Sequence, residues 1–184
     1  AGSEKYWAED GAGQQPEDAQ PEWPVYHTHF KMNPPLRSAQ DREAILEGLC
    51  DGTLDILASD HAPHAGHEKD VEFDYAPFGI TGLETELALS LMQLYHSGRL
   101  GLLELLAKFT VNPAGLLKLD KGNLSQGADA DVTVFDPDLK WAYNASSDAG
   151  KSSNSPFNGW QLRGRATVTM VAGKIVWRHE PVAA

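Results

Sequence analysis

The sequence predicts an α/β protein, because segments typical of strands and of helices alternate along its central part. A short apolar stretch at 54–58 leads directly into a polar run at 59–64, as at the end of a buried strand. Residues 26–32 form a second strand candidate, and a helical pattern follows each of the two. The order strand, helix, strand, helix implies parallel pairing through crossover connections, which is typical of barrels and doubly wound sheets.

Two helices are predicted from capping signals and from the spacing of apolar residues. The first begins at Ser38, which has Asp41 at capping-box spacing, and the second begins at Thr81, which has Glu84 at the same spacing. Glycines are expected to end both helices. The residues expected to face the core are Ile45, Leu46 and Leu49 in the first helix and Leu83, Leu87, Leu91 and Leu94 in the second, and the ending glycines are Gly52 and Gly98.

The remainder of the chain changes from helical to β patterning. A helix is predicted over 102–108, and another begins at Asn112, because Asn suits the N-cap position and Pro the first helical position. A strand is predicted over 132–135, closed by the Asp-Pro pair that follows it. A hairpin is predicted over 166–177, with its turn at Ala172–Gly173.

Composition and charge limit the classes of function. The 184 residues are enough for a core but fewer than the ~250 of a complete eight-stranded barrel. The formal net charge of -11 provides no basic footprint for nucleic acid or for an anionic membrane. A single cysteine, Cys50, cannot form an internal disulfide, and no signal-peptide pattern is recognised, so a cytoplasmic location is expected. Residues 1–25 are interpreted as a linker or an irregular segment.

Several short runs point to one enzyme family. The run Ser-Asp-His-Ala-Pro-His at 59–64 and the run Ala-Pro-Phe-Gly-Ile-Thr-Gly-Leu-Glu-Thr at 76–85 resemble the C-terminal active-site segment of the dihydroorotases, metal-dependent members of the amidohydrolase superfamily. Asn-Pro-Pro-Leu-Arg at 33–37 strengthens this resemblance. The resemblance implies the C-terminal part of a (β/α)8 barrel over 26–118, followed by a small β-sandwich domain over 119–184.

The resemblance also implies roles for five residues. Asp60 would bind the metal and accept the proton of metal-bound water. Asn33 and His64 would bind the substrate through their side chains. Phe78 and Gly79 would meet the substrate ring through their backbone groups, since glycine permits close approach. Four of these residues have a plainer alternative. Asp60 could be a helix-capping or loop acid, and His64 a surface imidazole. Asn33 could belong to a loop that is merely fixed by two prolines, and Phe78 could simply cover the site.

Other polar residues in these runs are interpreted as structural. His61 lies beside the proposed metal-binding acid and would orient the loop. His27 and His29 look like a His-x-His metal pair, yet they precede the Asn-Pro-Pro run rather than end a first barrel strand, so we interpret them as strand alternation. Arg37 could clamp a carboxylate, but the resemblance gives the substrate contact to Asn33.

The resemblance implies a zinc-dependent dihydroorotase, which interconverts N-carbamoyl-L-aspartate and dihydroorotate with one or two zinc ions. Catalytic zinc normally needs at least three protein ligands, and only Asp60 is found here, so the other ligands are expected outside the chain and the isolated chain is expected to be inactive. The alternatives are allantoinase, dihydropyrimidinase, or a non-catalytic subunit that scaffolds aspartate carbamoyltransferase. The expected partners are a small-molecule substrate and either a second copy of the chain or that transferase.

Overall fold

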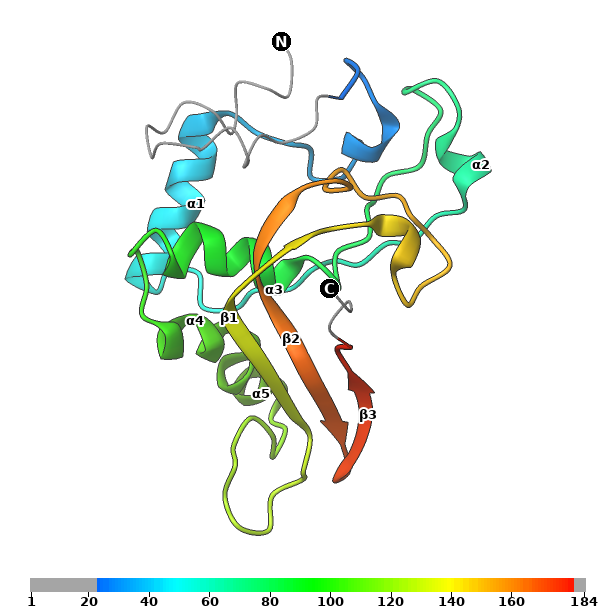
Figure 1. Cartoon of the computed structure of the whole chain (residues 1–184). Helices are drawn as coiled ribbons and strands as arrows, with labels where there is room; N and C mark the ends of the chain where they lie inside the picture. Colours follow the sequence, from blue (N-terminus) through cyan, green and yellow to red (C-terminus); the bar gives the residue numbers. More distant parts are fainter. Residues whose placement is uncertain (1–22, 181–184) are drawn as a thin grey trace. The chain divides into compact units, whose positions relative to one another are not determined.

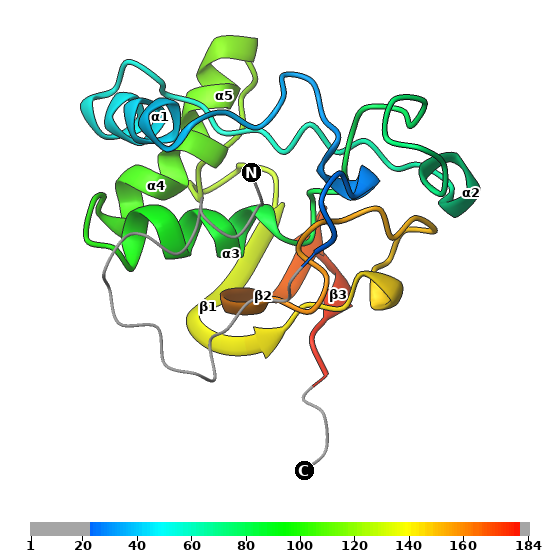
Figure 2. The same cartoon turned by 90° about the horizontal axis from the view of Figure 1, so that it is seen from above.

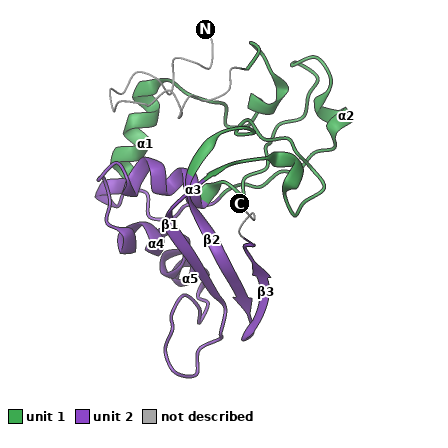
Figure 3. Ribbon diagram, viewed as in Figure 1, with its two compact units in different colours: residues 1–48, 59–86, 141–162 green, residues 49–58, 87–140, 163–184 purple. Residues whose placement is uncertain are grey.

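The computed structural model describes residues 23–180, so nearly all of the predicted linker at 1–25 lies outside the described residues. The chain divides into two compact units, coloured separately in Figure 3. The domain ranges 26–118 and 119–184 remain a prediction. Among the described residues, unit 1 comprises residues 23–48, 59–86 and 141–162, and unit 2 comprises residues 49–58, 87–140 and 163–180.

Unit 1 consists mainly of loops with a few short helices (Figure 1). Its principal helix begins as predicted, because the Ser38 hydroxyl accepts the Asp41 N–H at 3.1 Å and the Asp41 carboxylate accepts the Ser38 N–H at 3.2 Å. Leu46 and Leu49 are buried as expected, but Ile45 is 54% exposed, so its predicted place in the core is wrong. The helical segments are η3 (Thr28–Phe30), α1 (Ala39–Asp51, which continues into unit 2), α2 (Gly66–Lys69) and η5 (Ala145–Ser147).

Neither of the two predicted barrel strands is a strand in this structure. Residues 26–32 contain the single turn η3, and residues 54–60 are irregular. A strand requires a neighbour that completes its ladder of hydrogen bonds. Within the described residues, the Leu57 N–H donates instead to the carbonyl of Lys108, which belongs to a helix. The prediction of strands here was wrong because apolar patterning does not supply the partner.

The helices of unit 2 follow the predictions more closely. The second predicted helix appears as α3 (Glu86–Ser90) and continues as the π-helix η4 (Leu91–Tyr95). It begins later than Thr81 and leaves Leu83 61% exposed, so both of those predictions were wrong. α4 (Leu102–Phe109) is confirmed. α5 (Val111–Leu117) begins two residues early, with Thr110 at the N-cap, and the Asn112 side chain donates to the Asp55 carbonyl at 2.7 Å instead of capping the helix.

The strands form one antiparallel hairpin extended by a further strand. The sheet order is β1 (Val132–Ala142), β2 (Gln161–Val171) and β3 (Lys174–Arg178). β1 does not stop at Asp136 as predicted, since a proline is tolerated in an edge strand. The described residues contain this single sheet, so the β-sandwich remains a prediction. Helices α4 and α5 lie on the same side of β1 and β2 in both views (Figures 1 and 2).

The predicted hairpin turn is confirmed. Val171 pairs with Lys174 across Ala172 and Gly173, whose φ values are 48° and 76°. Positive φ at both central positions is the signature of a type I′ turn, which matches the twist of the flanking strands. The Asp131 carboxylate accepts the Ala172 N–H at 2.8 Å and holds the turn against the loop before β1. Within residues 23–180, no helix is both long and apolar enough to cross a membrane.

We expect Ala172→Asn to raise the free energy of unfolding by about 0.5–1 kcal/mol, because asparagine tolerates the left-handed conformation better than alanine does. Urea denaturation of the purified chain measures the change. Ala142→Asn is the matched control, since this exposed position in β1 has no positive φ, and it should stabilise nothing. Equal effects at the two positions would contradict the assignment of the gain to the turn.

Candidate functional site

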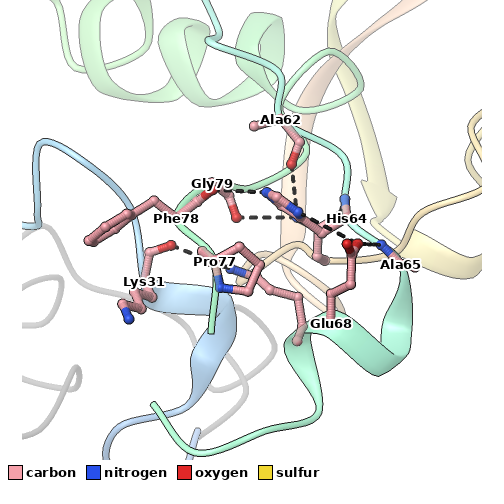
Figure 4. Close-up of polar contacts among 10 residues, drawn as sticks. Lys31, Ala62, His64, Ala65, Glu68, Pro77, Phe78 and Gly79 are labelled. Carbon is pink, nitrogen blue, oxygen red and sulfur yellow. Dashed lines mark hydrogen bonds and ion pairs between the residues drawn. The ribbon is translucent and has the colours of Figure 1, made fainter. Parts of the chain in front are cut away.

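Two loops of unit 1 bring together the residues predicted to bind substrate. Residues 59–64 and 76–82 run side by side, joined by the Ala62 N–H, which donates to the Ile80 carbonyl at 2.9 Å. The His64 Nε2 atom lies 2.9 Å from the Phe78 carbonyl oxygen (Figure 4). Three of the five predicted site residues, His64, Phe78 and Gly79, therefore meet at one place.

The imidazole of His64 is fixed in orientation. A carbonyl oxygen only accepts hydrogen bonds, so Nε2 carries the proton and donates to Phe78. The Glu68 carboxylate faces the other ring nitrogen, Nδ1, at 3.8 Å. The backbone N–H of His64 donates to the Asn154 side-chain oxygen at 3.0 Å. The ring is partly buried, with its donor held at the edge of the 76–82 loop.

Gly79 is required by both conformation and space. Its φ is +121°, and an added Cβ would lie 2.5 Å from the Ala62 Cβ and 3.3 Å from the His64 Nε2. Its N–H donates to the Lys31 carbonyl at 3.0 Å. Because Lys31 is two residues before Asn33, this bond brings the Asn-Pro-Pro loop next to the Phe78–Gly79 backbone.

Asn154 holds the two loops of the candidate site together, and the sequence did not single it out. It is 2% exposed, and its side-chain amide donates to the Ala62 carbonyl at 3.0 Å and to the Gly79 carbonyl at 3.2 Å. Its own backbone carbonyl accepts the Thr81 N–H at 3.1 Å. One amide group therefore ties both loops together. The only sequence signal was its place in the Ser-Asn-Ser-Pro-Phe run at 153–157, which we interpreted as part of the small β domain and not of a site.

Lys69 is a second buried polar residue beneath these loops. Its ammonium donates to the Pro77 carbonyl at 2.8 Å and to the Lys31 carbonyl at 3.4 Å. Burial, and next the charge of Lys31, lowers the pKa of Lys69 from its usual value. The Lys31 ammonium itself lies above the Phe78 ring, 4.9 Å from the ring centroid.

Asp60 is the second residue of the 59–64 loop and is exposed, with a φ of 47°. Non-glycine residues rarely adopt this region, Asp and Asn most readily among them, and such strain is concentrated at functional sites. Within residues 23–180, neither Asp60 nor the exposed Asn33 makes a hydrogen bond to His64, Phe78 or Gly79. The structure therefore places Asp60 and Asn33 on the connected loops, without joining them to the other three.

His61 holds the base of the same loop. Its Nδ1 accepts the Gly82 N–H at 3.1 Å, a geometry that suits the predicted loop-orienting role. Two carboxyls are close enough for its charge to act on them, Glu86 and Asp148. The pKa of each is raised mainly by burial, and His61 opposes that rise.

A metal centre is not formed by the described residues alone. Across residues 23–180, no three His, Cys, Asp or Glu side chains lie together in a way that could hold an ion. The rings of His27 and His29 lie with centroids 4.6 Å apart, but His27 Nδ1 already accepts the His29 N–H at 3.2 Å. The pKa of both histidines is lowered, chiefly by burial. Asp60 could offer one carboxylate to a metal whose other ligands lie elsewhere.

Sequence comparison relates the chain to one family of proteins. Residues 26–176 match the Amidohydrolase family. The dihydroorotase of Geobacter sp. (strain M21) is 54% identical over 153 residues, which are 83% of this chain and 36% of that protein. The dihydroorotase of Syntrophus aciditrophicus is 50% identical over 155 residues, which are 84% of this chain and 36% of that protein. The chain thus spans about a third of the length of these curated relatives.

Solved structures of hydantoinases have a fold similar to that of this chain. The L-hydantoinase (dihydropyrimidinase) from Arthrobacter aurescens matches with a TM-score of 0.79 and 33% identity, covering 86% of this chain and 36% of that one. The D-hydantoinase (dihydropyrimidinase) from Thermus sp. matches with a TM-score of 0.75 and 26% identity, covering 82% of this chain and 34% of that one. The predicted resemblance to the dihydroorotases is confirmed, and the TIM-barrel amidohydrolase fold is the one these matches indicate. With the family match spanning both loops of the site, the chain belongs to the amidohydrolase family.

Proposed function

We propose that this chain is the part of a zinc-dependent dihydroorotase that carries its substrate loops and proton carrier. The reaction opens dihydroorotate to N-carbamoyl-L-aspartate and closes it again, in pyrimidine biosynthesis. The proposal is supported by curated dihydroorotases at 45–54% identity and by the His64, Phe78 and Gly79 geometry.

The observation that carries the proposal is the meeting of His64 with the Phe78–Gly79 backbone. The ring N–H of His64 is a donor and the Phe78 carbonyl is an acceptor, and they lie on adjoining loops. A cyclic amide presents a carbonyl and an N–H along one edge, which matches such a pair. Asn33 would add a side-chain amide for the carboxylate of dihydroorotate.

The chemistry assigned to this chain is a proton transfer by Asp60. In ring opening, the oxygen of water bonds to the amide carbon, the C–N bond breaks, and the nitrogen gains a proton. Asp60 would accept that proton from the attacking water and deliver it to the leaving nitrogen. Its carboxylate is exposed and so accessible to a small molecule. Zinc belongs to the proposal as the metal of the family, and the ligands besides Asp60 lie outside residues 23–180.

We expect the purified chain to bind zinc weakly and to leave dihydroorotate unchanged, because one carboxylate is too few ligands. Metal analysis after gel filtration and a spectrophotometric assay measure both properties. Stoichiometric, tightly held zinc together with hydrolysis would contradict this expectation, and His27 and His29 would then have to be reconsidered as metal ligands.

The substrate is tested in a chimera in which residues 26–176 replace the matching segment of the Geobacter sp. (strain M21) dihydroorotase. Hydrolysis of dihydroorotate well above that of dihydrouracil or hydantoin is the expected result. The opposite preference would favour the second candidate function, that of a dihydropyrimidinase. This candidate is supported by the structural similarity to the L-hydantoinase (dihydropyrimidinase), which is 33% identical. A folded, zinc-loaded but inactive chimera would favour the non-catalytic subunit, and gel filtration with aspartate carbamoyltransferase would then test that partnership.

A further inference from the structure

We propose that Lys69 is a positioning residue for substrate, an inference that rests on the proposed function. Its ammonium fixes the backbone of the loop that carries Phe78 and Gly79 against the loop that carries Asn33. Lys69 itself lies in neither loop, since it is the last residue of the short helix α2. No substrate contact is assigned to it.

The ammonium of Lys69 is buried, so its hydrogen bonds within unit 1 must replace those it would make to water. The residue is 2% exposed, and none of the ion pairs among residues 23–180 includes it. A buried ammonium is costly unless hydrogen bonds replace its water. Here those bonds go to the Pro77 and Lys31 carbonyls, at 2.8 and 3.4 Å. The cation is therefore held where two backbone segments meet.

These two carbonyls determine the place of the substrate loop. Pro77 directly precedes Phe78, so the bond to its carbonyl fixes the chain at the entry to the Phe78–Gly79 peptide. The Lys31 carbonyl accepts from Lys69 and also from the Gly79 N–H at 3.0 Å. The Lys69 backbone is anchored as well, since its carbonyl accepts the Thr28 hydroxyl at 2.5 Å. Removing the ammonium would take one hydrogen bond from each side of the junction and leave the direct bond between the Gly79 N–H and the Lys31 carbonyl less supported.

Lys108 provides a matched comparison in unit 2. It is 5% exposed, and its ammonium donates to one backbone carbonyl, that of Leu54, at 2.8 Å. The two lysines share the same kind of burial and the same kind of bond. Only Lys69 touches the proposed substrate loop, so a difference between the two Lys→Met variants separates positioning from general stabilisation.

The first experiment uses the chain as it is and needs no activity. Amide hydrogen exchange is followed by NMR in Lys69→Met and Lys108→Met. We expect the Gly79 amide to exchange about tenfold faster or more in Lys69→Met, as for the loss of a hydrogen bond from a charged donor, and to change less than about twofold in Lys108→Met. Equal acceleration in both variants would overturn the proposal. If Lys69→Met does not fold, Lys69→Gln, which keeps a donor without the charge, replaces it.

The second experiment measures steady-state kinetics in the chimera. Lys69→Met should raise KM for dihydroorotate by about tenfold and lower kcat much less, because the loop contributes to binding rather than to proton transfer. Lys69→Arg, which keeps a cationic donor, should recover part of the loss. Lys108→Met should lower the Tm while leaving both constants unchanged. An inactive chimera with Lys69 intact would count against the proposed function, whereas accelerated Gly79 exchange would still support the positioning role.

Discussion

Replacing Asp60 by Asn in the chimera is expected to lower kcat for dihydroorotate hydrolysis by about 10²-fold or more. Asparagine has the same size but cannot accept the proton of the attacking water. The fold should survive, because Asp60 is exposed and asparagine tolerates a φ of 47° as well as aspartate does. Steady-state kinetics, with zinc content measured on the same sample, tests this expectation.

Two other variants test whether the loss of kcat in Asp60→Asn is specific to the proton carrier. Asp70→Asn, at an exposed carboxylate ten positions further along the chain, should leave kcat unchanged. Asn33→Ala should raise KM at least as much as it lowers kcat, since it removes a binding group rather than a proton carrier. An Asp60→Asn enzyme with full zinc and nearly normal kcat would remove Asp60 from the mechanism.

Gly79→Ala is expected to lower the free energy of unfolding of the chain by about 3 kcal/mol. Its φ of +121° is strained for alanine, and the new Cβ would lie 2.5 Å from the Ala62 Cβ. The loop must move to relieve the overlap, and the bond between His64 and Phe78 should be lost with that movement. Urea denaturation measures the stability, and the His64 ring resonances in an NMR spectrum report the bond.

Gly66→Ala is the control for this substitution. Gly66 has no positive φ, and an added Cβ there would meet nothing within 4 Å. Its free energy of unfolding should therefore change by less than about 1 kcal/mol. If the Gly79→Ala chain is as stable as Gly66→Ala and the His64 resonances do not move, the loop accommodates a Cβ at position 79, and the steric argument is wrong.

Features determined by nearby residues were predictable from the sequence. The cap between Ser38 and Asp41 and the turn at Ala172–Gly173 each depend on residues within three positions of one another. The roles of His64, Phe78 and Gly79 in substrate binding were assigned through the resemblance to the dihydroorotases and stay a prediction, and the bond between His64 and Phe78 was not part of it. A family motif can carry information about residue roles that local patterns lack, because it describes a whole loop of the family's fold.

Features that depend on distant partners were not predictable. The segments 26–32 and 54–60 have the composition of strands, but no described strand pairs with either of them. Asn154 is 90 positions from His64, and Lys69 is 38 positions from Lys31, the carbonyl of which it binds. A buried side chain that bonds to backbone groups leaves no periodicity in the sequence. Such residues become recognisable only when the loops are seen folded against each other.

The bond between His64 and Phe78 also bears on which ligands the site would accept. In the structure the two groups proposed for substrate satisfy each other at 2.9 Å, so an incoming ring must exchange with an existing bond. A ring that offers both a carbonyl and an N–H gives each of the two groups a new hydrogen bond: its carbonyl accepts from His64, and its N–H donates to the Phe78 carbonyl. A ring methylated at that nitrogen would leave the Phe78 carbonyl without a donor, at a cost of about 1–3 kcal/mol. The site would therefore reject such an analogue through the bond left unmade, in addition to any clash with the methyl group.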